Sequence, residues 1–222
     1  MQFFNPFHII AVLIAISVHE CAHGLMARFL GDPTAERDGR LTLNPLAHLD
    51  PLGALLFLVV GFGWAKPVPV NPAYFRHPAR DTALTALAGP ASNLLLAFLS
   101  FLLMVAVSSR VPGSATELLY GTSSDWLLGS LLARLAMSSL FVNLGLMAFN
   151  LLPIAPLDGS KIVQIVIPYR YQSQYEDFLR NGPWILLVLL LTESLLPIHV
   201  ISVWVYWIIT TFLHGFALVV PF

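Results

Sequence analysis

An apolar run from Phe7 to Leu30 contains a cluster of ionisable side chains, and this combination constrains the fold more than any other feature. Apolar segments of about 20 residues are long enough to span a bilayer as an α-helix. Inside such a segment, ionisable side chains are costly unless they are paired or bound to a metal. We therefore expect a transmembrane helix that carries a functional site.

His19, Glu20 and His23 have the spacing H-E-x-x-H within this run. Residues four apart lie on the same face of a helix, so His19 and His23 can bind one metal ion while Glu20 lies beside it. This spacing is typical of zinc hydrolases. The alternative is a chance match in which both histidines are hydrogen-bonded to neighbouring helices, and a location inside a membrane helix argues against it.

Composition indicates that most of the chain lies in a membrane. Of the 222 residues, 57% are hydrophobic and 10% are charged, and the mean hydropathy is +0.79. A soluble domain of this length cannot bury so much apolar surface. A net charge of −1 without basic runs gives no indication of nucleic-acid binding. The single cysteine, Cys21, excludes an internal disulfide and a cysteine-rich zinc site, so a bound metal needs histidine and carboxylate ligands.

We predict an all-α polytopic membrane protein with about five transmembrane helices and a re-entrant or extended element between the first two full spans. The first helix is expected at residues 6–30. The element lies between Gly39 and Pro78 and combines a short strand at 39–45, an apolar segment at 51–64 and a proline-rich extended stretch. The apolar segment, at about 14 residues, is short for a helical span, and the sequence leaves open whether it crosses the bilayer or re-enters.

The basic residues favour re-entry of the short segment over crossing. Six of them flank it: Arg28, Arg37, Arg40, Lys66, Arg76 and Arg80. If the segment re-enters, all six lie on one side of the membrane, as the positive-inside tendency prefers. The loop at 108–125 carries one basic residue and is expected on the opposite side, and the polar stretch 169–182 fits the basic side again.

The second full span, expected at residues 82–107, carries a stripe of small and polar residues at i+4 spacing: Thr85, Gly89, Asn93 and Ala97. Such a stripe lets another helix approach closely. Asn93 would face that neighbour. Its role is either a hydrogen bond between helices or a direct part in chemistry.

Asp158 follows the next apolar helix, after a segment with two prolines that interrupt regular hydrogen bonding. A carboxylate at this place would complete a zinc site of two histidines and one carboxylate, with a fourth position open for water. Two further apolar stretches, 183–197 and 199–216, are expected to form a C-terminal helical hairpin over about 183–220.

Three motifs together resemble those of the site-2 protease family of intramembrane zinc metalloproteases. They are H-E-x-x-H at 19–23, Gly-Pro-Ala-Ser-Asn at 89–93, and the segment from Asn150 to Gly159. The stretch 61–72 is similar to a compact prokaryotic branch of that family, without a PDZ or CBS module. The resemblance covers about residues 7–168, taken as the catalytic core of a single membrane domain over 1–222.

The resemblance implies one Zn²⁺ per chain, held by His19, His23 and Asp158, with Glu20 as the catalytic carboxylate. It also implies that Asn150 helps to place the substrate backbone, and Asn150 or Asn93 is a candidate oxyanion donor. The expected partners are a transmembrane protein substrate and the lipid bilayer, with no nucleic acid, and the oligomeric state stays open. The active-site end and the basic loops are expected to face the cytoplasm of a prokaryotic inner membrane.

Other functions place similar residues in a membrane. A metal transporter often has repeated halves, but the H-E-x-x-H pattern occurs only once in this sequence. A di-iron bundle needs a second E-x-x-H motif, which is missing. An inactive homologue that binds membrane helices as a scaffold is the third alternative, and the intact ligand set with Glu20 argues against it.

Overall fold

A computed structural model describes residues 5–60, 63–108, 127–195 and 199–219 of the chain. Within these ranges the chain forms helices and no strand. The α-helices are α1 (Pro6–Phe29), α2 (Thr34–Arg37), α3 (Pro51–Val60), α4 (Pro78–Ser108), α6 (Leu127–Asn150), α7 (Asp158–Gln164), α8 (Gln172–Leu195) and α9 (Val200–Val219). Three 3-10 turns accompany them: η1 (Pro45–Ala47), η2 (Pro72–Tyr74) and η4 (Tyr169–Tyr171).

Four helices of the described part are long and apolar enough to cross a membrane: α1, α4 over Pro78–Val107, α6 over Leu131–Asn150, and α9. The predicted all-α polytopic membrane fold is therefore confirmed. The sequence predicts about five transmembrane helices, and four are found in the described residues. The remaining apolar stretch, which starts at Pro183, forms the second half of α8, whose first half is polar.

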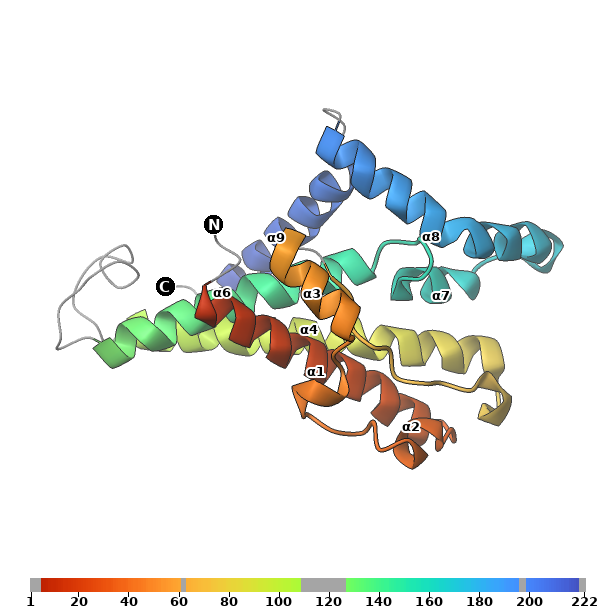
Figure 1. Cartoon of the computed structure of the whole chain (residues 1–222), viewed down its shortest axis with the longest axis horizontal. Coiled ribbons are helices and arrows are strands. Elements are labelled where there is room, and N and C mark those ends of the chain that lie inside the picture. The colour runs from red at the N-terminus through yellow and green to blue at the C-terminus, as the bar shows by residue number, and fades with distance from the viewer. Residues whose placement is uncertain (1–4, 61–62, 109–126, 196–198, 220–222) are drawn as a thin grey trace.

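The bundle of α1, α4 and α6 is the centre of the molecule, where these three helices contact one another directly (Figure 1). α9 packs on α6 and closes an apolar core with α4. The buried side chains of this core are Ala97, Phe101, Leu140, Leu144, Met147, Ala148, Ile208 and Phe216. Leu94 of α4 packs against this core, and its neighbour Asn93 is hydrogen-bonded to His19, so the core adjoins the part of α1 that carries the histidines.

In its described residues, the element between the first two full spans contains a short helix, α3, and no helix of membrane-spanning length, which is consistent with the predicted re-entrant or extended element. α3 has 10 residues, which rise about 15 Å at the helical pitch, about half of a bilayer's hydrocarbon thickness. The chain then returns beside its own entry point. Leu49 and Ala65 form an isolated antiparallel bridge, and the Lys66 N–H donates to the His48 carbonyl over 2.9 Å.

The short strand predicted at residues 39–45 is wrong. The backbone N–H groups here bond to nearby side chains and not to a neighbouring strand. The Asn44 side chain accepts a hydrogen bond from the Leu46 N–H and so caps η1. Thr42 accepts from the Asn44 N–H in the same way. Asn and Thr side chains compete with regular secondary structure by such bonds. The loop expected at 108–125 lies almost entirely outside the described residues.

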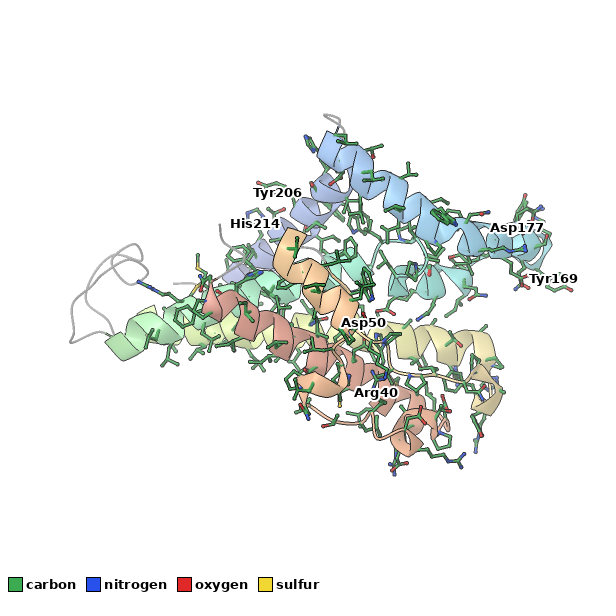
Figure 2. All side chains as sticks on the ribbon, viewed as in Figure 1. Arg40, Asp50, Tyr169, Asp177, Tyr206 and His214 are labelled. Atoms are coloured by element: carbon green, nitrogen blue, oxygen red, sulfur yellow. The ribbon has the colours of Figure 1, made fainter. Side chains whose placement is uncertain are left out.

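The C-terminal part consists of α8 and α9, which meet near the start of α9 (Figure 1). Glu193 of α8 accepts hydrogen bonds from the backbone N–H groups of Ile201 and Ser202, and so caps α9. Tyr169, in η4, and Asp177, in the first half of α8, lie away from the end of α8 that meets α9 (Figure 2). The polar stretch 169–182 is thus largely helical and continuous with the apolar stretch that follows.

Candidate metal centre

Three potential metal ligands converge where α1 meets the start of α7. The Nε2 atoms of His19 and His23 each lie 3.2 Å from Oδ2 of Asp158, and the two Nε2 atoms are 3.0 Å apart. All three side chains are buried. Among the histidine, cysteine and carboxylate side chains in the described part of the chain, these three form a group close enough to share one ion.

These distances fit a tetrahedral zinc site. Zinc binds histidine nitrogen and carboxylate oxygen at about 2.0–2.2 Å, so neighbouring ligands of a tetrahedron lie about 3.3 Å apart. The three observed separations of 3.0–3.2 Å agree with this edge length. The donor set is the one that the H-E-x-x-H spacing and the position of Asp158 suggest.

Hydrogen bonds on the far side of each imidazole determine which nitrogen faces the centre. Nδ1 of His23 lies 2.7 Å from the Thr85 carbonyl, which can only accept, so the hydrogen is on Nδ1. Nδ1 of His19 lies 2.6 Å from Oδ1 of Asn93. Both Nε2 atoms therefore direct lone pairs at the Asp158 carboxylate, and a cation between them removes the repulsion.

Two glycines allow the helices to approach the centre closely. A Cβ atom on Gly89 of α4 would lie 2.5 Å from Nε2 of His23 and 2.6 Å from Cε1 of His19. A Cβ atom on Gly159, next to Asp158, would lie 2.4 Å from the Leu151 carbonyl oxygen. Only glycine fits at these two places, so α4 supports the imidazoles and α7 starts directly against the end of α6.

Glu20 is buried beside the potential ligands and is held by an extended segment, residues 65–71, that we call the strap. The backbone N–H of Val68 donates to Oε2 of Glu20 over 2.7 Å. The two ends of the strap are anchored separately. Arg40 donates to the Lys66 carbonyl over 2.7 Å, and the Asn71 N–H donates to Asp32 over 2.6 Å.

The two asparagines singled out from the sequence lie in different surroundings. Asn93 is fully buried next to His19, and its amide nitrogen donates to Asn143 over 2.8 Å and to the Ala15 carbonyl over 3.3 Å. Asn150 ends α6, and its amide donates to the Leu146 carbonyl over 3.0 Å. Within the described residues, no hydrogen bond joins Asn150 to the three potential ligands.

Sequence reasoning missed three supporting contacts of the site. They are the Val68 N–H on Glu20, the Thr85 carbonyl on His23, and Asn143 behind Asn93. The first two are backbone groups, which leave no residue-specific signal in a sequence. Asn143 has a signal, because an asparagine in an apolar helix is expensive to bury without a partner.

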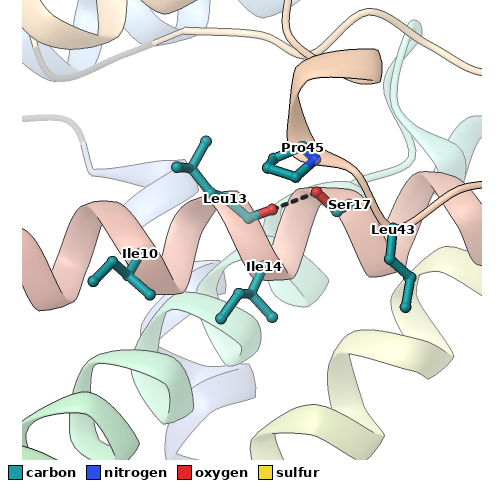
Figure 3. A pocket seen from close by; sticks show the side chains of 6 residues that line it. All are labelled: Ile10, Leu13, Ile14, Ser17, Leu43 and Pro45. Carbon is teal, nitrogen blue, oxygen red and sulfur yellow. Dashed lines mark hydrogen bonds between the residues drawn. The ribbon is translucent and has the colours of Figure 1, made fainter.

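An apolar pocket of about 210 Å³ lies along α1, on turns that precede His19 in the sequence (Figure 3). Its lining residues are Ile10, Leu13, Ile14, Ser17, Leu43 and Pro45. The hydroxyl of Ser17 donates to the Leu13 carbonyl of the same helix over 2.7 Å. The pocket contains no ionisable side chain, so it adds no chemical group to the centre.

A buried zinc-type ligand set with an adjacent carboxylate, set between helices of membrane-spanning length, defines a membrane-embedded metallohydrolase. The sequence pattern described as "Peptidase family M50" matches residues 7–191, and the chain belongs to this family, the site-2 protease family that its motifs resemble. The protein is accordingly a zinc metalloprotease and an integral membrane protein.

Relatives from bacteria and an archaeon support the assignment. "Putative zinc metalloprotease YwhC" of Bacillus subtilis is 38% identical over 84% of this chain and 81% of its own length. "Putative zinc metalloprotease Rip2" of Mycolicibacterium smegmatis is 31% identical over 82% of this chain and 66% of its own length. "Putative zinc metalloprotease MJ0611" of Methanocaldococcus jannaschii is 31% identical over 70% of this chain and 68% of its own length. No solved structure matches the chain.

Proposed function

We propose that this zinc metalloprotease hydrolyses peptide bonds within or near transmembrane segments of membrane protein substrates, the reaction of regulated intramembrane proteolysis. The observation that carries the proposal is the place of the ligands. His19 and His23 lie on α1, a helix of membrane-spanning length, and they meet Asp158 inside the helical bundle. A peptide bond cleaved there must itself lie at membrane depth or close to it.

In this proposal His19, His23 and Asp158 would hold one Zn²⁺, and three protein ligands are the number that catalytic zinc sites combine with a bound water. When bound, zinc makes water more acidic and polarises the carbonyl group of the scissile bond. The chain's own part is to orient the ligands. The Thr85 carbonyl and the Asn93 amide keep the hydrogens of both imidazoles on Nδ1, and Gly89 leaves room for the rings.

Glu20 acts as the general base. Its carboxylate takes a proton from the attacking water and later delivers it to the leaving amide nitrogen. The Val68 N–H holds Oε2, so the other carboxylate oxygen, Oε1, is the one assigned to proton transfer. Glu20 thereby works from a fixed position beside the ligands and is not a ligand itself.

We assign Asn150 to substrate placement, as a donor to the substrate backbone or to the oxyanion that forms on it. It lies at the end of α6, where the chain turns toward Asp158. Asn93, the other candidate oxyanion donor, has donated its amide hydrogens to Asn143 and Ala15. Its contribution to catalysis is therefore proposed to act through His19.

The substrate helix has to unwind before its peptide bonds become accessible, because its own hydrogen bonds cover them. The strap limits how an extended substrate can bind nearby. Pro67 and Pro69 have no N–H, and Val68 uses its N–H on Glu20. A substrate segment beside the centre of the strap therefore finds carbonyl acceptors and no free N–H donor.

We further propose that residues 1–222 form one membrane domain, with a catalytic core at about 7–168 and a C-terminal hairpin at about 183–220. The basic loops and the active-site end would face the cytoplasm of a prokaryotic cell, in keeping with the positive-inside tendency. No part of the proposal involves nucleic acid.

The test is cleavage of a model single-span membrane protein in liposomes that contain the purified full-length chain. Cleavage is expected within the span, is expected to stop when zinc is removed by a chelator, and to return when zinc is restored. Glu20→Gln is expected to abolish cleavage while zinc remains bound. Cleavage by Glu20→Gln at the wild-type rate, or cleavage that persists in fully zinc-free protein, would contradict the proposal.

A further inference from the structure

A buried polar network runs from the metal centre across two helices. From His19 it passes to Asn93 on α4 and then to Asn143 on α6, where the Asn93–Asn143 bond is 2.8 Å. Both asparagines are 0% exposed. Asn143 in turn donates to the carbonyl of Ser139 over 2.8 Å. Each link joins a donor to an acceptor, although the surrounding core is apolar.

The direction of every bond in this network follows from its last member. The Ser139 carbonyl can only accept, so the amide nitrogen of Asn143 must face it and the Asn143 oxygen must face α4. That oxygen accepts from the amide nitrogen of Asn93, which leaves the Asn93 oxygen facing Nδ1 of His19. Nδ1 therefore carries the hydrogen, and Nε2 keeps its lone pair for the metal.

We propose that Asn143 is a positioning residue of the metal centre, which selects the metal-binding tautomer of His19 through Asn93. The proposal rests on the zinc ligands proposed above. Asn143 supplies the shorter of the two bonds that orient Asn93, 2.8 Å against 3.3 Å to the Ala15 carbonyl. Helix-to-helix adhesion alone would not require the two amides to point in one direction.

Loss of the Asn143 oxygen has a specific consequence for His19. The Asn93 amide then keeps only the longer bond to the Ala15 carbonyl. A rotation that breaks this one bond turns its N–H group toward Nδ1 of His19. An N–H at this place can bond only to an unprotonated Nδ1, so the hydrogen moves to Nε2 and faces the metal position. Zinc must then displace this hydrogen in order to bind.

The first measurement is zinc affinity of the full-length protein in detergent, obtained by competition with a chromophoric chelator. Asn143→Leu keeps the approximate volume and removes the acceptor, and we expect it to bind zinc about 10–100-fold more weakly, the range typical of groups that orient metal ligands. Ser100→Ala is the matched control. Its hydroxyl donates to the Ser139 hydroxyl at the far end of the network, so its loss leaves the Asn143–Ser139 carbonyl bond intact.

The second measurement separates positioning from packing. Nitrogen-15 NMR of the histidines in the zinc-free protein reports the tautomer of His19, and we expect hydrogen on Nδ1 in the wild type. In Asn143→Leu, and in Asn143→Ala, which adds no volume, the Nε2–H form is expected to increase. Unchanged tautomers in both variants would overturn the proposal, even if zinc affinity fell, because the loss would then be structural.

A His19→Leu variant distinguishes failure of this inference from failure of the proposed ligand set. If His19→Leu loses zinc while both Asn143 variants bind it within threefold of wild type, the ligand set stands and the role of Asn143 falls. If His19→Leu binds zinc as tightly as wild type, the proposed ligand set is wrong, and the proposed role of Asn143 is wrong as well.

Discussion

The backbone N–H of Val68 donates a hydrogen bond of 2.7 Å to the carboxylate of Glu20, a residue 48 positions earlier in the chain. Glu20 belongs to a regular helix, but the N–H group that orients it belongs to the extended strap. Within the strap, Val68 has a proline on each side. Because the strap is anchored independently by Arg40 and Asp32, the position of the carboxylate depends on a segment outside the helical bundle.

Replacing Val68 with proline is expected to slow catalysis while zinc stays bound. A hydrogen bond to a charged group contributes about 1.5–3 kcal/mol, so kcat should fall roughly tenfold to a hundredfold. The strap is extended and already contains two prolines, which makes a third compatible with its backbone. Val68→Ala keeps the N–H and should retain most of the activity. Equal loss in both variants would show that the side chain, and not the N–H, matters.

Replacing Asp158 with alanine is expected to remove zinc from the purified protein. It takes away one of three converging donors and leaves two imidazoles with no compensating charge. Metal analysis by mass spectrometry should show well below one zinc ion per chain. Asp177→Ala removes an exposed carboxylate on α8 and serves as the control. A full zinc complement in Asp158→Ala would exclude Asp158 from the ligand set.

Replacing Gly89 with alanine is expected to weaken zinc binding at least tenfold, because the added methyl group overlaps both imidazole rings. The rings would have to rotate away from Asp158. Gly145→Ala on α6 is a matched control, since a methyl group there meets no atom within 4 Å. Chelator competition on both variants checks the prediction, and equal affinities would show that the rings adapt without losing the ion.

Replacing Glu193 with alanine is expected to destabilise the C-terminal part of the protein without changing zinc affinity. Its carboxylate satisfies the backbone N–H groups of Ile201 and Ser202 at the start of α9. Loss of such a cap costs about 1 kcal/mol. The midpoint of thermal unfolding in detergent should fall, whereas Glu176→Ala, an exposed carboxylate of α8, should leave it unchanged. The reverse order of the two midpoints would refute this role.

The sequence predicted the helical membrane fold and the three residues that converge, because both depend on strong local patterns. Long apolar runs indicate spans, and i+4 spacing on a helix places His19 and His23 on one face without any tertiary information. The carboxylate of Asp158 could be proposed because the apolar helix before it ends at a proline-rich turn. That Asp158 lies 3.2 Å from both imidazoles is a tertiary fact.

What the sequence did not predict depends on backbone groups and on competition between local bonds. Alternation at residues 39–45 suggested a strand, but Asn44 and Thr42 bond to nearby N–H groups and favour turns. The Thr85 carbonyl and the Val68 N–H support the site through atoms that every non-proline residue possesses. No residue pattern distinguishes such groups before the fold is known.

His19 and His23 lie near the start of the chain, whereas Asp158 follows α6, so α1, α4 and α6 all precede the last potential ligand. Chains are synthesised from the N-terminus. During biosynthesis, therefore, the ribosome makes all three helices before it makes the last of the three potential ligands. A nascent chain that does not yet include Asp158 holds only two of the three potential ligands, so the group cannot form before α1, α4 and α6 have all been made.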